Sequence, residues 1–138
     1  MSQADLGLYV ADTGTPRGNG VFAARDFPAG ALLEVCTVLP YRMSFDRLGP
    51  ELQTMVFDWS EDDDPRPFHA HVLGFGSFYN HANPSNCRYE AHRDALEMHY
   101  YTVVPIARGT ELTINYDGDG GPTSDEDYWF EAMGIPRL

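Results

Sequence analysis

Turn-forming residues cut this sequence into short segments, and this spacing limits the fold more than any other feature. Thirteen glycines and ten prolines are spread through 138 residues. Between them, the apolar or alternating stretches are about four to ten residues long, which is typical of strands and short for helices. The alternation is strictest at 111–116, where Leu112, Ile114 and Tyr116 share one face. The sequence therefore predicts a mostly β fold with short helices, formed as a single domain over residues 1–138.

Further strands are expected where β-branched and aromatic residues gather between turns. They are 7–10, 20–23, 31–39 and 95–104. A short helix is expected at 44–48, with Ser44 as its N-cap. A second short helix is expected at 124–130, where acidic residues form the first turn. The segment 52–59 fits either a strand or a helix.

The charge of the chain excludes some classes of partner. Twenty-one acidic residues oppose nine basic ones, for a net charge of -12, and every basic residue is arginine. This composition does not easily supply the basic face that nucleic acid requires. No apolar run approaches the roughly 18–20 residues of a membrane helix, and no secretory signal is visible. We therefore expect an intracellular protein without a nucleic-acid or membrane partner. Its acidic surface would attract cationic partners, although solubility or a salt-adapted source explains the same charge.

Metal-ligand residues do not form a convincing pattern. His69 and His71 could chelate a metal from one strand face, with His81 and the acidic run 62–64 as further candidates. No third ligand has the usual spacing, and the two cysteines are too few for a disulfide scaffold. A metal enzyme on a β-barrel is the alternative that these residues leave open, but we expect no metal.

Three short motifs carry residues suited to binding and catalysis. They are Gly18-Asn19-Gly20, Asn80-His81, and Tyr116 followed by Tyr128 and Trp129. Glycine in the first motif lets a ligand approach the backbone closely. The second begins a polar loop after an apolar strand, and the third begins at the end of the alternating strand. Each alone has an ordinary structural explanation, as a tight turn, an Asx-rich turn or core aromatics.

In this order the motifs resemble those of the SET-domain family of protein-lysine methyltransferases. The matching segments are 18–23 (Gly-Asn-Gly-Val-Phe-Ala), 80–86 (Asn-His-Ala-Asn-Pro-Ser-Asn) and 109–116 (Gly-Thr-Glu-Leu-Thr-Ile-Asn-Tyr). The resemblance extends from Leu8 to Phe130 and is strongest to small stand-alone members from bacteria and large viruses. It implies a β-fold of several small sheets with a C-terminal pseudoknot.

The resemblance also implies a cofactor, S-adenosylmethionine, which would leave as S-adenosylhomocysteine. The substrate would be the lysine amine of a Lys/Arg-rich protein, such as a histone-like tail. The implied cofactor-binding residues are Gly18, Asn19, Gly20, Asn80, His81, Tyr116 and Trp129. The implied catalytic residues are Tyr116 and Tyr128, and the implied lysine channel is lined by Tyr79, Met55 and Tyr128.

The chain departs from the family pattern at several positions: the motif proline comes one position early, at Pro84, and the spacing from Tyr116 to Tyr128 is longer than in the most compact relatives. The family usually has serine where this chain has Ala82, and small relatives often have tyrosine where it has Met55. A module that binds S-adenosylmethionine or a basic peptide without turnover is therefore the alternative function. The resemblance includes homodimers among the expected assemblies. It implies a cytoplasmic protein if the source is bacterial, and a nuclear or chromatin-associated one if the source is viral or eukaryotic.

Overall fold

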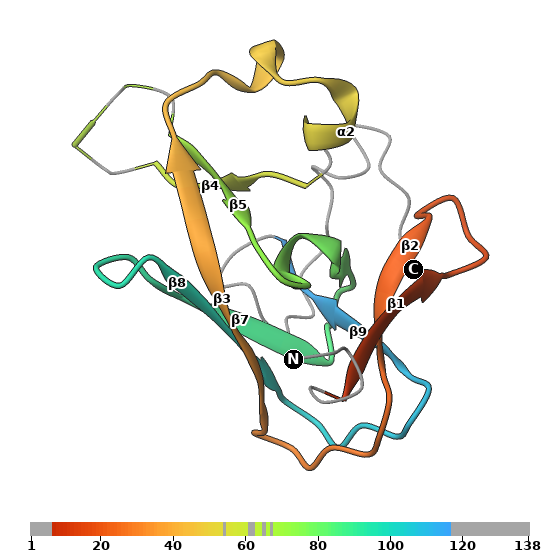
Figure 1. Cartoon of the computed structure of the whole chain (residues 1–138). Coiled ribbons are helices and arrows are strands. Elements are labelled where there is room, and N and C mark those ends of the chain that lie inside the picture. The colour runs from red at the N-terminus through yellow and green to blue at the C-terminus, as the bar shows by residue number, and fades with distance from the viewer. Residues whose placement is uncertain (1–6, 54, 61–62, 65, 67, 117–138) are drawn as a thin grey trace.

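The structure is a computed structural model that describes residues 7–53, 55–60, 63–64, 66 and 68–116 (Figure 1). The described strands are β1 (Leu8–Asp12), β2 (Asn19–Ala23), β3 (Leu32–Tyr41), β4 (Phe57–Asp58), β5 (His69–Val72), β6 (Asn80–His81), β7 (Cys87–His92), β8 (Glu97–Thr102) and β9 (Glu111–Ile114). The described helices are short: η1 (Phe45–Arg47), α2 (Pro50–Gln53) and η2 (Gly76–Phe78). The predicted mostly β fold is confirmed.

The described strands form two sheets. The first has the order β1-β2-β9-β6, and the second has the order β4-β5-β3-β8-β7. In the first sheet β9 lies between β2, to which it is antiparallel, and β6, to which it is parallel. Figure 1 shows β9 near the middle of the molecule, between the β1–β2 pair and β7. Because β6 and β9 are far apart in sequence, their pairing joins two distant motifs.

One hydrophobic cluster lies between the sheets and holds them together. Along β3, Cys36 and Val38 point into this cluster and are buried, whereas Val35 and Leu39 face outward and are exposed. This is the alternation expected of a strand with one covered face. The central strand thus supplies core residues and, from the same face, the buried carboxyl group of Glu34.

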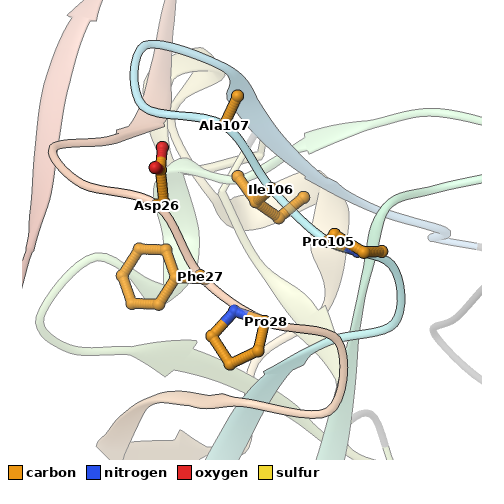
Figure 2. A pocket seen from close by; sticks show the side chains of 6 residues that line it. All are labelled: Asp26, Phe27, Pro28, Pro105, Ile106 and Ala107. Carbon is orange, nitrogen blue, oxygen red and sulfur yellow. The ribbon is translucent and has the colours of Figure 1, made fainter.

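Two turns tie the sheets together away from the motifs. Phe27 and Ile106 exchange a pair of main-chain hydrogen bonds, each 2.9 Å long. Figure 2 shows a shallow hollow beside this bridge. Its lining residues are Asp26, Phe27, Pro28, Pro105, Ile106 and Ala107. None of the described motif residues is among them, so this hollow is not part of the candidate site.

Local predictions are confirmed to different degrees. The ambiguous segment 52–59 contains the end of α2 and the short strand β4. The predicted helix at 44–48 is the single turn η1, and Ser44 is its N-cap as predicted, although the Ser44 side chain makes no capping hydrogen bond. In such a short turn the Ser44 main-chain carbonyl already accepts the Arg47 N–H at 3.1 Å. The helix predicted at 124–130 lies outside the described residues. No helix in the described part of the chain is long and apolar enough to cross a membrane.

Candidate active site

The three sequence motifs meet at β9. In the parallel β6–β9 pair, Asn80 lies opposite Thr113 and His81 lies opposite Ile114. On its other side β9 pairs with β2, which begins at Asn19. The pairing of three strands therefore brings together segments that lie far apart in the sequence.

The Asn80 side chain joins all three motifs. Its Nδ2 donates to the Asn19 main-chain oxygen at 2.9 Å and to Glu111 Oε2 at 2.8 Å. An amide nitrogen carries two hydrogens, so these two bonds use both. Glu111 is therefore a site residue that the sequence analysis missed. The signal available was its place in the matching segment 109–116, as the first residue of the alternating strand.

Gly18 and Gly20 are needed for different reasons. A Cβ at Gly20 would lie 2.4 Å from Glu111 Oε2 and 2.9 Å from Asn80 Nδ2. Any side chain there would therefore disturb the Asn80–Glu111 bond. Gly18 has a φ of 77°, a left-handed conformation that favours glycine, and a Cβ there would meet nothing within 4 Å. The backbone is thus open at Gly18 and closely packed at Gly20.

His81 is buried and holds the chain that follows β9. It is 1% exposed, and its Nδ1 accepts the main-chain N–H of Tyr116 at 3.0 Å. A neutral imidazole that accepts at Nδ1 carries its hydrogen on Nε2. The His81 and Tyr116 rings lie 5.3 Å apart, centroid to centroid. His81 therefore fixes the main chain from which the Tyr116 side chain extends.

Tyr116 is a partly exposed residue whose hydroxyl is anchored to the main chain. The residue is 38% exposed, yet its hydroxyl donates to the main-chain oxygen of Tyr79. Burial of the phenol raises the pKa of Tyr116 to about 12, while nearby Arg17 lowers it and Glu111 raises it. The phenol therefore stays neutral at physiological pH. Arg17 directly precedes Gly18 in the first motif, and the sequence analysis assigned it no role in the site.

Asn86 completes the hydrogen bonding of β9. Its Nδ2 donates to the Glu111 main-chain oxygen at 2.8 Å, and its Oδ1 accepts the Thr113 N–H at 2.8 Å. The Asn86 main-chain N–H also donates to Thr113 Oγ1 at 3.2 Å, and both Thr113 and Asn115 are buried. Ala82 donates its main-chain N–H to Ile114 at 3.0 Å. That contact does not depend on the side chain at this departure from the family pattern.

The Tyr79 side chain is packed in the core. Tyr79 is 1% exposed, and its ring stacks on Tyr100 with centroids 4.5 Å apart and planes 4° apart. Its hydroxyl donates to Glu34 Oε1 at 2.9 Å. That this side chain lines the lysine channel stays a prediction. Tyr79 contacts Tyr116 through its main-chain carbonyl.

The other candidate residues are only partly described. Met55 is half-buried in the turn after α2, where its main-chain N–H donates to the Leu52 oxygen at 3.0 Å. Its place along a channel stays a prediction. Tyr128 and Trp129 lie outside the described residues, and their roles also stay predictions. Within the described ranges, no three histidine, cysteine or acidic side chains are grouped so that they could hold a metal ion.

The chain is similar to several known proteins. The family model described as SET domain matches residues 18–117. A histone-lysine N-methyltransferase from Schizosaccharomyces pombe, described as specific for lysine 37 of histone H3, is 30% identical over 127 residues, or 90% of this chain and 77% of the relative. A solved structure of a candidate histone methyltransferase from Plasmodium falciparum has a TM-score of 0.62 at 21% identity, covering 80% of this chain and 92% of that one. A polycomb repressive complex 2, autoinhibited and bound to S-adenosylmethionine, has a TM-score of 0.64 at 18% identity, covering 92% of this chain and 17% of that one.

Proposed function

This chain belongs to the SET-domain family of protein-lysine methyltransferases, and we propose that it transfers a methyl group from S-adenosylmethionine to lysine side chains of a Lys/Arg-rich protein. The observation that carries this proposal is the meeting of the three motifs around β9. Asn80 ties Asn19 to Glu111 there, and His81 fixes the main chain of Tyr116. Residues that the family resemblance assigns to one site thus contact one another.

The described site suits a ligand that carries positive charge. Oxygen acceptors gather there, namely the Glu111 carboxylate, the Asn19 and Tyr79 main-chain oxygens and the Tyr116 hydroxyl oxygen. The open backbone at Gly18 lets a ligand lie against the main chain. When bound, S-adenosylmethionine would supply a methyl group made electrophilic by its sulfonium. The residues that would hold it are Gly18, Asn19, Gly20, Asn80, His81 and, outside the described residues, Trp129.

The lysine amine has to lose a proton before it can accept a methyl group. At pH 7 this costs about 4–5 kcal/mol from a pKa near 10.4. An apolar, aromatic channel disfavours the charged ammonium, and a nearby positive charge disfavours it further. No dedicated general base is then required. This agrees with Tyr116, whose raised pKa keeps the hydroxyl protonated.

Tyr116 would align the amine for the displacement. Its proton is donated to the Tyr79 carbonyl, so the lone pairs of its oxygen are the groups it can offer to a second partner. A neutral phenol oxygen of this kind accepts an amine N–H. Alignment is the main contribution that a protein makes to a displacement between two bound groups. Losing one aligned polar contact in a site that excludes water commonly costs about a hundredfold in turnover.

A Lys/Arg-rich substrate is supported by the charge of the chain. The net charge is -12, and the Glu111 carboxylate lies in the site itself. Such charges steer a cationic partner over about 8 Å at physiological salt. The KM for a basic peptide should therefore rise with added salt, whereas the affinity for the cofactor should change less. Equal methylation of a neutral and a basic peptide, without salt dependence, would refute this part of the proposal.

The test is transfer of a labelled methyl group to lysine peptides. The chain has no lysine, so label found on lysine belongs to the added substrate and not to automethylation. Tyr116→Phe should fold, bind S-adenosylhomocysteine and lose about a hundredfold in turnover. Tyr41→Phe is the matched control, because it removes a tyrosine hydroxyl that bonds His71 Nδ1 at 2.9 Å on the outer face of the second sheet. Wild-type turnover in Tyr116→Phe would exclude this tyrosine from the mechanism.

The alternative function, binding without turnover, predicts a different result in the same experiments. In that case S-adenosylmethionine would raise the melting temperature by selecting the folded state, yet no lysine peptide would gain label. The absence of any thermal shift at millimolar cofactor would contradict methyl transfer and cofactor binding, and would leave only the binding of a basic peptide.

A further inference from the structure

A buried carboxyl group lies behind the active site and holds one segment at both ends. Glu34 in β3 is 7% exposed. Its Oε2 accepts the main-chain N–H of Phe75 at 3.4 Å, and its Oε1 accepts the Tyr79 hydroxyl at 2.9 Å. Phe75 directly precedes η2 and Tyr79 directly follows it. The Glu34 side chain therefore ties the start of this turn to its end.

The segment around η2 is built to fit this carboxyl group. Gly74 has a φ of 70°, and a Cβ there would lie 3.3 Å from Glu34 Oε2. A Cβ at Gly76 would lie 2.1 Å from Val72 Cγ1, and the Gly76 carbonyl accepts the Tyr100 hydroxyl at 3.1 Å. Both glycines thus allow a close approach that a side chain would prevent. The turn is held tightly from two sides.

Tyr79 connects Glu34 to the active site. Its side chain is fixed by the Glu34 bond and by the stacked ring of Tyr100. Its main-chain carbonyl accepts the hydroxyl of Tyr116. Because the side chain and the carbonyl belong to one residue, fixing the ring restricts the direction of the carbonyl. A chain of contacts therefore runs from Glu34 through Tyr79 to Tyr116.

Packing alone does not account for a carboxyl group at this place. Burial raises the pKa of Glu34, although hydrogen bonds from Tyr79, Cys36 and Phe75 oppose the rise. Burial also raises the pKa of Tyr79 well above its usual value, and the Glu34 charge raises it further. Burying a carboxyl group is costly, and apolar side chains of the same size commonly fill such a space at lower cost. A role beyond packing gives a reason for the polar pair.

We infer that Glu34 is a positioning residue for methyl transfer: by holding Tyr79, it sets the carbonyl that orients the Tyr116 hydroxyl. This inference rests on the proposed function. Glu34 touches neither substrate nor cofactor in this account and acts only through Tyr79. The orientation that it provides sets the direction in which the Tyr116 oxygen would meet the lysine amine.

Three variants separate this role from a general contribution to the core. Tyr79→Phe keeps the stacked ring and removes the hydroxyl, and Glu34→Leu removes its acceptor. Glu34→Gln keeps a carbonyl oxygen that can still accept the Tyr79 hydroxyl. A typical hydrogen bond corresponds to about tenfold in rate, so kcat should fall by about tenfold or more in the first two variants and by less in Glu34→Gln. The KM for the cofactor should change by less than about threefold. Tyr41→Phe, which loses a hydroxyl bond of the same length, should keep its rate.

A double-mutant cycle tests whether the effect passes through Tyr116. In the Tyr116→Phe background there is no hydroxyl to orient, so adding Tyr79→Phe should leave the remaining rate unchanged. The ¹³Cζ resonance of Tyr116, identified by its absence from Tyr116→Phe, should shift in Tyr79→Phe and Glu34→Leu but stay in place in Tyr41→Phe. This resonance reports on Tyr116 without turnover.

The outcomes distinguish the inference from the function on which it rests. In an active enzyme, the positioning role would be overturned if the rate losses of Tyr79→Phe and Tyr116→Phe multiply in the double variant. It would also be overturned if the Tyr116 resonance does not shift in Tyr79→Phe. Failure of Glu34→Gln to retain more rate than a properly folded Glu34→Leu would also overturn it. No turnover by the wild type on any lysine peptide would overturn the proposed function, and the positioning role with it.

Discussion

Asn80→Asp tests the contact that joins the three motifs, because it replaces a donor by an acceptor of nearly the same shape. In the wild type, Asn80 Nδ2 donates to the Asn19 main-chain oxygen at 2.9 Å and to Glu111 Oε2 at 2.8 Å. A bond to a neutral carbonyl contributes about 1 kcal/mol, and one to a carboxylate about 1.5–3 kcal/mol. Since the residue is half-buried, the lower values apply. The variant should therefore lose about 3 kcal/mol of unfolding free energy at pH 8, or about 10 °C in melting temperature.

The loss should depend on pH in a direction that the geometry fixes. The new carboxyl group would face Glu111 and a carbonyl oxygen, so its pKa in the folded state is raised above its unfolded value near 3.9. A group with a raised folded pKa contributes stability at low pH, and this stability is lost as the pH rises through that pKa. Urea denaturation from pH 4.5 to pH 8 should thus show a deficit that grows with pH.

Two companion variants make this prediction specific. Asn80→Ala removes the same donors without adding charge, so its deficit should be nearly independent of pH. Adding Glu111→Gln to Asn80→Asp gives the new carboxylate an amide donor and should restore part of the lost stability. A deficit in Asn80→Asp that matches that of Asn80→Ala at every pH, together with no rescue, would refute the contact and the argument built on it.

Three further predictions follow from individual contacts. Gly76→Ala should unfold the protein or lower its free energy of unfolding by more than about 3 kcal/mol, because the new Cβ would lie 2.1 Å from Val72 Cγ1. Gly49→Ala is the control, because the atom nearest to its new Cβ would be 3.6 Å away. Thermal denaturation should show almost no change in the stability of this control. Asn86→Ala should lower the free energy of unfolding by about 2–4 kcal/mol in urea denaturation. The reason is that the Glu111 carbonyl and the Thr113 N–H in β9 lose their side-chain partner. A loss below about 1 kcal/mol would contradict this prediction. The stability of the wild type relative to Glu34→Gln should fall as the pH rises above 4.5, since burial raises the pKa of this carboxyl group in the folded state. A difference that grows in the opposite direction would show that the hydrogen bonds outweigh burial.

Much of the local structure could be predicted from the sequence because its causes are local. The alternation at 111–116 predicted β9, and the turn signals predicted the boundaries of β2 and β3, because period and turn chemistry depend on neighbouring residues. The resemblance of three motifs also led to the correct family, which the family model and the relative confirm. These features need no knowledge of distant contacts.

Contacts between residues that lie far apart in the sequence could not be predicted. The sequence analysis did not anticipate that Glu34, far from Tyr79 in sequence, accepts its hydroxyl and holds the ring in the core. It also did not anticipate that Asn86 Oδ1 accepts the Thr113 N–H. No local pattern signals either contact.

The sequence by itself indicated most of the candidate site residues, the alternating strand that precedes Tyr116 and the family to which the chain belongs. Tertiary structure alone decided that Glu111 is the partner of Asn80, that Gly20 leaves room for this pair and that the Tyr79 carbonyl receives the Tyr116 hydroxyl. The physical reason is the parallel pairing of β6 with β9, a nonlocal contact whose register sets which side chains face each other. Hydrogen-bond partners follow from that register, and a linear pattern of residue types does not contain it.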